Sequence, residues 1–268
     1  MFSVVIPAYN CENTIADVLD SVRKQTRVDL IREIIVINDG SSDQTGAVIN
    51  KYMQDHRELN IIYKEHPNKG VSKTRNQGIR MAKSEWIALL DSDDVWLEHK
   101  IEVQYKILRE NPQIVFLGAH QPLKFWWKTH QELYKLNAME LCVRSMPTTP
   151  SVVFKKEAGL RHGLFDENRK YCEDIAFFQK FLLDDSYYVL PEKLVEISIG
   201  KKYFGQSGLS SKLYKMHKGR KQNIRELNQM GLITARYMYF MLVVSEMKFV
   251  RRFLQQKLQH LIYGTEKQ

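Results

Sequence analysis

The feature that most constrains the fold of this chain is a regular alternation, through its first half, of short apolar runs and segments with helical spacing. Residues 34–37 are apolar at four successive positions, which is typical of a strand buried on both faces of a parallel sheet. The alternation predicts strands at 3–7, 33–38, 60–64 and 86–90, and helices at 13–24, 44–53, 71–82 and 97–108. We therefore expect an α/β fold in which helices cover both faces of a parallel sheet.

Sheets of this kind bind ligands beyond the carboxyl ends of their strands, and one such window holds Asp91, Asp93 and Asp94 around Ser92. Three carboxylates in four residues repel one another and need a countercharge. A divalent cation supplies it, because Mg²⁺ and Mn²⁺ typically take one or two carboxylates together with substrate phosphates. The alternative is an Asp-rich turn that caps a helix starting near Trp96, a role that suits Asp94 in particular.

A second polar window follows the predicted strand 33–38. Asp39 stands at the end of that strand, where a carboxylate can accept hydrogen bonds from a nucleobase or a ribose. Gly40 permits a turn, and Ser41 and Ser42 fit better as N-cap residues of the following helix. We expect Asp39 alone to have a ligand-binding role here.

Two further groups carry charge at informative positions. Arg75, in the predicted helix 71–82, can grip an anionic group or hold an aspartate loop in place, whereas Lys69 and Lys73 fit a solvated helix face. Glu173 and Asp174 are the first two residues of an apolar helix that we expect at 173–183. Such a pair usually favours the positive end of the helix dipole, but it can also supply a general base near a substrate.

Taken in order, these motifs resemble the family 2 glycosyltransferases with the GT-A fold, of the type that builds bacterial cell-surface polysaccharides. The resemblance covers roughly the first 200 residues and rests on the joint order of the motifs. It implies a Rossmann-like nucleotide-binding half, a mixed but mostly parallel sheet with helices on both faces, and a C-terminal helical extension. The segments that carry it are 4–10, 39–43, 68–70, 75–78, 90–94 and 173–174.

The resemblance assigns a donor-binding role to residues from several of these segments. Pro7, Ala8 and Tyr9 would line the pocket of the base, with Tyr9 near the uracil. Asp39 would read the edge of the base, and Arg75 would lie in the segment that contacts the nucleotide.

The remaining assignments concern the metal and the reaction. Asp91 would contact the ribose, with Ser92 beside it in the donor site, and Asp93 would reach the metal on the diphosphate. Asp174 would be the general base of an inverting enzyme, with Glu173 next to it. Relatives often carry a late Tyr-Arg-x-His-like stretch, but residues 201–210 contain no histidine, so Lys201 or Lys202 would have to neutralise the phosphate instead.

The implied activity is the transfer of a hexosyl or N-acetylhexosaminyl group, with inversion, from a nucleotide sugar that we expect to be a UDP-sugar. The acceptor would be a hydroxyl of a glycan or of a lipid-linked glycan, and the cofactor a divalent cation, Mn²⁺ or Mg²⁺. Two alternatives stay open. Nucleotidyltransferases also use Asp-rich metal loops on α/β sheets, and a basic chain can be a non-enzymatic nucleic-acid-binding module.

The positive charge of the chain is concentrated at its end. Residues 1–200 carry 26 Lys and Arg against 28 Asp and Glu, whereas residues 201–268 carry 14 against 3. We place a catalytic domain at 1–210 and a basic amphipathic helical tail at 211–268. Aromatic side chains interleave with the bases of the tail, which favours contact with an anionic membrane surface over nucleic acid. A helix packed back on the catalytic domain is the alternative.

The compartment is predicted from what the sequence lacks. Its three cysteines are widely spaced, with no CxxC pair, which supports neither a zinc site nor a disulfide framework. No signal peptide or membrane-spanning run is evident, so we expect a cytoplasmic enzyme at the inner face of the cell membrane. Trp126 and Trp127 could touch a lipid-linked acceptor, although core packing is the commoner place for tryptophan.

Overall fold

A computed structural model describes residues 1–120, 133–144, 147–197 and 212–263, with side chains of the last helix described as far as residue 255. Within these ranges the strands form one eight-stranded sheet, in the order β3-β2-β1-β4-β8-β6-β9-β7, and a two-stranded sheet of β5 and β10. The strands are β1 (Phe2–Ala8), β2 (Ile31–Asn38), β3 (Ile61–Glu65), β4 (Trp86–Leu89), β5 (Val95–Trp96), β6 (Phe116–Ala119), β7 (Tyr134–Lys135), β8 (Val153–Lys155), β9 (Tyr187–Leu190) and β10 (Val195–Glu196).

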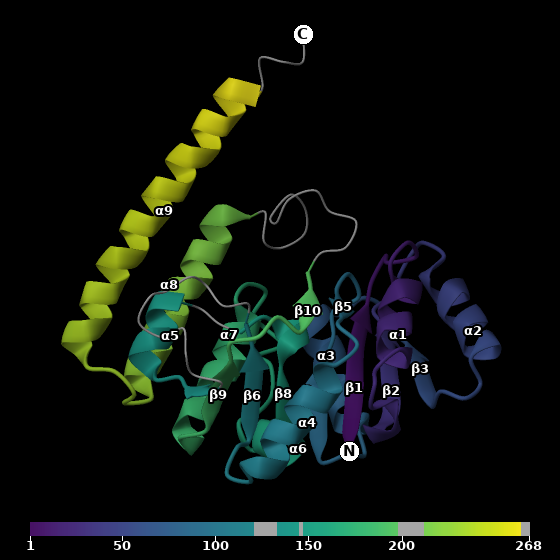
Figure 1. Cartoon of the computed structure of the whole chain (residues 1–268). Helices are drawn as coiled ribbons and strands as arrows, with labels where there is room; N and C mark the ends of the chain where they lie inside the picture. Colours follow the sequence, from purple (N-terminus) through teal and green to yellow (C-terminus); the bar gives the residue numbers. More distant parts are fainter. Residues whose placement is uncertain (121–132, 145–146, 198–211, 264–268) are drawn as a thin grey trace.

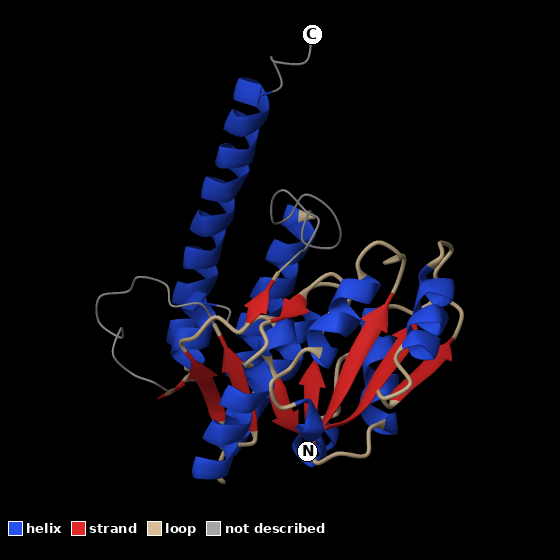
Figure 2. Cartoon of the chain, turned by 45° about the vertical axis from the view of Figure 1, so that its right-hand side comes forward, coloured by secondary structure: helices blue, strands red, loops and turns tan. Residues whose placement is uncertain are grey.

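Helices pack on both faces of the large sheet, as Figures 1 and 2 show. The helices of the body are α1 (Ile15–Arg23), α2 (Thr45–Asp55), α3 (Val71–Met81), α4 (Lys100–Glu110), α5 (Ala138–Arg144), α6 (Lys156–Arg161) and α7 (Glu173–Phe178). Short 3₁₀ turns lie at Val28–Leu30, Thr149–Ser151 and Gln179–Asp184. The predicted layered α/β architecture is therefore confirmed.

The first half of the sheet is parallel because its strands are apolar on both sides. In β1, Val4 and Ile6 join the core that packs against α1 and α4, while Val5 between them faces the core that contains Ile79 of α3. Gly78 lets α3 approach closely, since a Cβ there would lie 2.5 Å from Val5 Cγ1. The register pairs β1 with β2 on one side and β4 on the other, so their carboxyl ends meet at one edge.

The second half of the sheet is mixed. β8 runs antiparallel to both β4 and β6, and β7 runs antiparallel to β9, whereas β6 and β9 are parallel. This arrangement matches the mixed, mostly parallel sheet that the resemblance implied. Two local predictions are wrong: the helix expected near Trp96 begins at Lys100, after the short strand β5, and the helix expected at 173–183 becomes a 3₁₀ turn after Phe178.

The chain ends in a helical hairpin of α8 (Leu213–Gln229) and α9 (Ala235–Tyr263), which Figure 1 shows beside the body with α9 projecting well past it. Ile224 and Leu227 of α8 and Met241 of α9 share a small core with Ala138 and Cys142 of α5. The predicted domain boundary at residue 210 lies outside the described residues. In the part of the chain that is described, no helix is both long and apolar enough to cross a bilayer.

Candidate functional site

The candidate site lies at the carboxyl ends of β1, β2 and β4, where the loops 8–10, 38–43 and 90–94 converge. Asn10 has a left-handed backbone, with φ of 47°, and its side-chain oxygen accepts a hydrogen bond from the Ser42 amide at 2.9 Å. Its own amide donates to Ser41 Oγ at 3.0 Å. These contacts tie the loop after β1 to the loop after β2, so two of the predicted windows form one structure.

Ser41 and Ser42 do not cap the following helix. α2 begins at Thr45, and it is Asp43 that accepts hydrogen bonds from the Thr45 amide at 3.0 Å and the Thr45 hydroxyl at 2.6 Å. The two serines instead form hydrogen bonds with Asn10, as described above. The expectation that they act as N-caps is therefore wrong, because the loop closes against β1 before the helix starts.

Asp39 is buried beneath the loop that precedes α3. Its two carboxylate oxygens accept hydrogen bonds from the amides of Lys69 at 2.7 Å and Gly70 at 2.9 Å, and His66 Nδ1 lies 3.4 Å away. Gly40 next to it has φ of +69°, and a Cβ there would lie 2.7 Å from the Asn68 amide nitrogen. The carboxylate is thus held at the strand end in one orientation.

The segment after β1 presents an aromatic ring beside Asp39's loop. Pro7 and Ala8 are buried at the end of β1, whereas Tyr9 is 51% exposed. The Asp39 amide donates to the Ala8 carbonyl at 2.8 Å, which places Tyr9 and Asp39 on adjacent loops. A planar base could therefore stack on the exposed ring of Tyr9 while its edge contacts the fixed carboxylate of Asp39.

The aspartate loop leaves β4 toward the same edge. Its backbone is fixed by Thr14 Oγ1, which donates to the Ser92 carbonyl at 2.6 Å, and by the Asp94 amide, which donates to the Asp91 carbonyl at 3.2 Å. Asp91 and Asp93 are half-buried, while Asp94 is buried. Because Asp94 is followed by strand β5, its expected role as a helix cap is wrong.

Arg75 is the centre of the charged cluster. Its Nη2 lies 2.6 Å from Asp91 Oδ1 and its Nη1 lies 3.2 Å from Glu173 Oε1, so one buried guanidinium joins the loop after β4 to the start of α7. Burial by itself lowers the pKa of this group, but the charges of Asp91 and Glu173 outweigh it and hold the pKa above its usual range. Of the two roles open to Arg75, the geometry shows the one that holds an aspartate loop.

Glu173 and Asp174 are adjacent in the chain and largely shielded from solvent. Glu173 is buried, and burial together with the charge of Asp174 raises its pKa to about 7 despite the opposing effect of Arg75. Burial also raises the pKa of Asp174, whose Oδ1 accepts the Ile175 amide at 2.8 Å and whose Oδ2 lies 3.5 Å from the Thr149 hydroxyl. A carboxylate with a raised pKa is a stronger proton acceptor, which suits a general base better than a simple capping residue.

Arg169, which no sequence motif singles out, anchors the backbone just before this pair. Its guanidinium donates to both Glu226 oxygens at 2.8 and 2.9 Å, to the Gly219 carbonyl at 2.9 Å and to Asn223. Asn223 in turn donates to the Cys172 carbonyl at 3.3 Å. Helix α8 thus clamps the loop that leads into α7. No local motif signals this contact, because it joins residues more than fifty positions apart.

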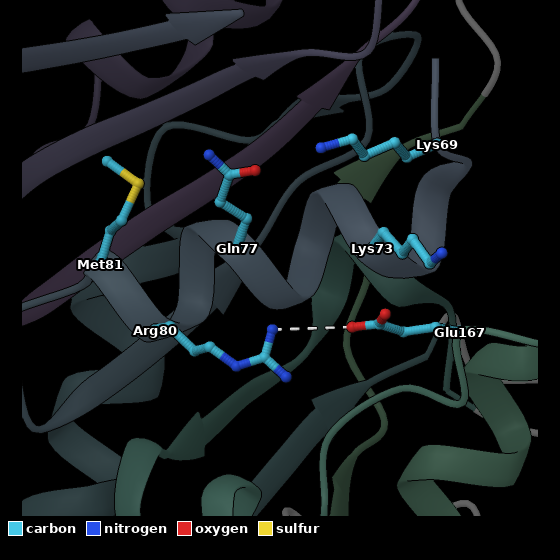
Figure 3. Close-up of a pocket in the computed structure, with 6 residues that line it drawn as sticks. All are labelled: Lys69, Lys73, Gln77, Arg80, Met81 and Glu167. Atoms are coloured by element: carbon cyan, nitrogen blue, oxygen red, sulfur yellow. Dashed lines mark ion pairs between the residues drawn. The ribbon is translucent and has the colours of Figure 1, made fainter. Parts of the chain in front are cut away.

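Lys69 and Lys73 lie on the solvent side of α3, as expected for a solvated helix face. Lys69, just before α3, and Lys73 line an open pocket of about 610 Å³ together with Gln77, Arg80 and Met81 of α3. Figure 3 shows these side chains. Arg80 reaches across the pocket to Glu167, with 3.6 Å between nitrogen and oxygen. Arg75 is buried on the opposite side of the helix, so this pocket is separate from the charged cluster.

The residues of the aspartate loop fit a hard divalent cation. In the described ranges no three His, Cys, Asp or Glu side chains gather into a cluster that could hold a metal by themselves. A Mg²⁺ or Mn²⁺ that is shared with a diphosphate needs only one or two protein carboxylates, and Asp93 is a half-buried oxygen donor at the right strand end.

Several predicted residues lie outside the described ranges. These are Trp126 and Trp127, the phosphate-binding candidates Lys201 and Lys202, and the rest of the late stretch 201–210. The three cysteines are all described; each is buried and free.

Comparison with known proteins gives the same family as the motifs. The model of "Glycosyl transferase family 2" matches residues 3–169, which is more than half of the chain. A glycosyltransferase of Rickettsia felis is 29% identical over 201 residues, covering 74% of this chain and 33% of the relative. The chain spans between 25% and 63% of the length of the first four curated relatives.

Solved structures share the fold. TarS (residues 1–349) of S. aureus, in complex with UDP-GlcNAc, has a TM-score of 0.68 at 20% identity, covering 90% of this chain and 70% of that one. The mannosyltransferase PcManGT of Pyrobaculum calidifontis, in complex with GDP-Man and Mn²⁺, has a TM-score of 0.69 at 17% identity, covering 92% and 69%. These structures confirm the predicted GT-A fold, and the family match shows that this chain belongs to glycosyl transferase family 2.

Proposed function

We propose that this protein is an inverting, metal-dependent glycosyltransferase that moves a hexosyl or N-acetylhexosaminyl group from a UDP-sugar to a hydroxyl of a glycan or lipid-linked glycan in cell-surface polysaccharide synthesis. The observation that carries the proposal is the buried cluster in which Arg75 joins Asp91 of the donor-side loop to Glu173, the neighbour of Asp174. The cluster brings a loop suited to a nucleotide diphosphate and a carboxylate suited to proton removal to one edge of the sheet.

The residues divide into a donor side and an acceptor side. Tyr9 would stack on the base, and Asp39, held by the amides of Lys69 and Gly70, would accept a hydrogen bond from its edge. Asp91 would contact the ribose beside Ser92. Asp93 would hold the cation, which supplies Lewis-acid stabilisation of the leaving diphosphate when bound.

The reaction then needs one base and no covalent nucleophile. The acceptor oxygen attacks the anomeric carbon while its proton passes to Asp174, and the bond from that carbon to the diphosphate oxygen breaks. The nucleoside diphosphate leaves with the electron pair, and a single displacement inverts the anomeric centre. Glu173 and Arg75 would position the base, because Glu173 is next to Asp174 in the chain and is paired with the buried Arg75.

The choice of a UDP-sugar is supported by several observations rather than by one contact: the family match, the exposed Tyr9 and the UDP-GlcNAc bound to a structural neighbour all favour it. The Mn²⁺ of the mannosyltransferase supports the divalent cation. GDP-Man, bound to that same neighbour, is the competing donor that the experiment must include.

The test is donor turnover by the full chain. Purified protein is incubated with UDP-Glc, UDP-Gal, UDP-GlcNAc, UDP-GalNAc or GDP-Man, with Mn²⁺, Mg²⁺ or a chelator, and the released nucleotide is identified. We expect nucleoside diphosphate with one UDP-sugar, dependence on the cation, and loss in Asp174→Asn but not in Glu157→Gln, a matched carboxylate change on the exposed surface of α6.

Three outcomes would overturn the proposal. Release of pyrophosphate from a nucleoside triphosphate would indicate nucleotidyl transfer instead. Salt-sensitive binding of RNA or DNA, together with no binding of UDP, would indicate a nucleic-acid-binding module. Retention of anomeric configuration in the product would contradict the single displacement through Asp174.

A further inference from the structure

Helix α9 carries an exposed apolar stripe, which we define as Tyr239, Val243, Met247, Val250 and Leu254. Their side chains are 65%, 60%, 67%, 52% and 53% exposed. Spacings of four, four, three and four residues keep them on one side of the helix, and the fifteen residue steps from Tyr239 to Leu254 span about 22 Å. Phe240, which is 61% exposed, lies at the edge of the stripe. A run of this length and exposure is more than scattered surface hydrophobicity.

The opposite side of α9 is already used for packing. Met241 and Ser245 are buried against α8, and Phe249 stacks on His217 of α8 with 4.4 Å between ring centroids. The Lys248 ammonium donates to the carbonyl of Val143 in α5 at 3.1 Å. Helix α9 is therefore apolar on two sides, and only one of these is covered by the hairpin and α5. The stripe is left for a different partner.

The charge around the stripe selects an anionic partner. Residues 212–255 contain ten Lys and Arg but only two acids, Glu226 and Glu246. Both acids are paired: Glu226 with Arg169, and Glu246 with His217 and Lys221. Exposed bases border the stripe, with Arg236 one turn before Tyr239 and Arg251 next to Val250. Arg252 lies instead on the side of α9 that carries Lys248, near Arg220 of α8.

A second copy of the chain fits this surface less well. Helices that pair through an apolar stripe usually carry complementary acidic and basic residues along the borders of the stripe. Here the bordering residues that bear charge are mainly bases, so two stripes brought together would repel each other. A nucleic acid could contact the basic side chains of α9, but it would leave the apolar side chains of the stripe exposed to water.

We propose that the α9 stripe docks on the surface of an anionic lipid bilayer, with Tyr239, Val243, Met247, Val250 and Leu254 inserted at the level of the headgroups and Arg236 and Arg251 against the lipid phosphates. Figures 1 and 2 show α9 projecting past the body in the direction in which β1 runs. The docking itself does not depend on the proposed function.

The experiment is co-sedimentation of the full chain with vesicles of phosphatidylcholine alone or with about 30% phosphatidylglycerol. We expect binding to the anionic vesicles only, weakening as salt rises from about 0.05 to about 0.5 M. The double variant Val243→Ser/Met247→Ser should bind about tenfold more weakly, and Arg236→Gln/Arg251→Gln should lose most of the preference for phosphatidylglycerol.

The matched control is Leu160→Ser/Leu183→Ser, which removes two apolar side chains of similar exposure from other parts of the surface, 45% and 51%. It should bind as the parent does. Asp174→Asn should also bind as the parent does, so that failure of docking and failure of catalysis can be distinguished.

Two results would overturn the inference. One is equal binding of the parent and the Val243→Ser/Met247→Ser variant to anionic vesicles. The other is a dimer of the parent in sedimentation equilibrium without lipid, dissociated by the same variant and accompanied by no vesicle binding, which would assign the stripe to a second copy.

Discussion

Replacing Glu173 by glutamine should make the protein more stable than its parent at alkaline pH, although the change removes an ion pair. The Glu173 side chain is almost fully buried, with its Oε1 3.2 Å from Arg75 Nη1 and Asp174 beside it in the chain. Burial, and then the charge of Asp174, raises its pKa from an ordinary 4.5 to about 7 in the folded protein. The folded state therefore disfavours the ionised carboxylate even with Arg75 present.

The sign of the pH effect follows from proton binding. Between the unfolded and folded pKa values of 4.5 and about 7, the folded protein holds a proton at Glu173 that the unfolded chain has released. Stability from this group is complete below the lower value and is lost as the pH rises to the upper one. At 1.36 kcal/mol for each pH unit, the loss is about 3 kcal/mol.

Glutamine does not titrate, so the variant should lack this loss. The free energy of unfolding, measured by urea titration at several pH values between about 5 and about 8, is compared between variant and parent. Taking the difference cancels the titration of groups far from position 173. The free energy of unfolding of the variant minus that of the parent should rise by about 2 kcal/mol across this range and level off above pH 7.

The control is Glu157→Gln on the exposed surface of α6, where the carboxylate is in water in both states. Its difference from the parent should not vary with pH. A difference for Glu173→Gln that is equally flat would refute the reasoning, because it would mean that the folded protein does not disfavour the charge at this site.

Four further predictions concern activity and the α8 contact. Asp174→Asn should lower kcat by about 10² to 10⁴ with little change in UDP affinity, measured by nucleotide release and calorimetry. The parent's kcat/KM should fall about tenfold per unit as the pH drops below about 7, since the Glu173–Asp174 pair then takes up a proton. Asp93→Asn should raise the Mn²⁺ concentration needed for half-maximal activity, and a chelator should abolish activity. Glu226→Gln should lower the free energy of unfolding by about 2 kcal/mol, because it leaves Arg169 charged and buried, and should lower kcat as well.

Each of these has a result that would contradict it. An Asp174→Asn enzyme with normal kcat would place the base elsewhere, and a flat pH profile down to about 5 would mean that the pair does not control the reaction. Unchanged Mn²⁺ dependence in Asp93→Asn would remove that residue from the metal. Normal stability and normal kcat in Glu226→Gln would show that α8 does not support the base.

The parallel half of the sheet could be predicted because the apolar pattern that specifies each strand lies within a short segment of the sequence. Residues 34–37 lie in β2 because four apolar side chains in a row can be buried only between two layers of helices. Because the carboxyl ends of parallel strands meet at one edge of a sheet, the sequence also predicts that the acidic and polar windows lie at that edge. The order of the later strands was not predictable in this way, since β8 lies between β4 and β6 through pairings that no short segment contains.

The site shows the same division. The approximate positions of Asp39, Asp91 and Glu173 followed from strand ends and motif order, but their partners did not. Arg75 was predicted to contact the nucleotide, an assignment that stays a prediction, while its bond to Glu173 spans 98 positions in sequence. Arg169 was missed for the same reason, because a lone arginine in a loop has no signature until α8 is packed beside it.

The C-terminal hairpin links the proposed general base to the proposed membrane contact. Its first helix fixes the loop before Glu173 through Arg169, Asn223 and the Cys172 carbonyl, while its second helix presents the apolar stripe away from the body. The helices themselves share a core, with Ile224 and Met241 both buried in it. A surface that binds lipid through α9 would therefore be joined to the base by packed side chains rather than by a linker. If so, anionic vesicles should raise kcat in the parent but not in a Glu226→Gln variant that still binds them, and a rise of equal size in both would show that the membrane only concentrates the acceptor.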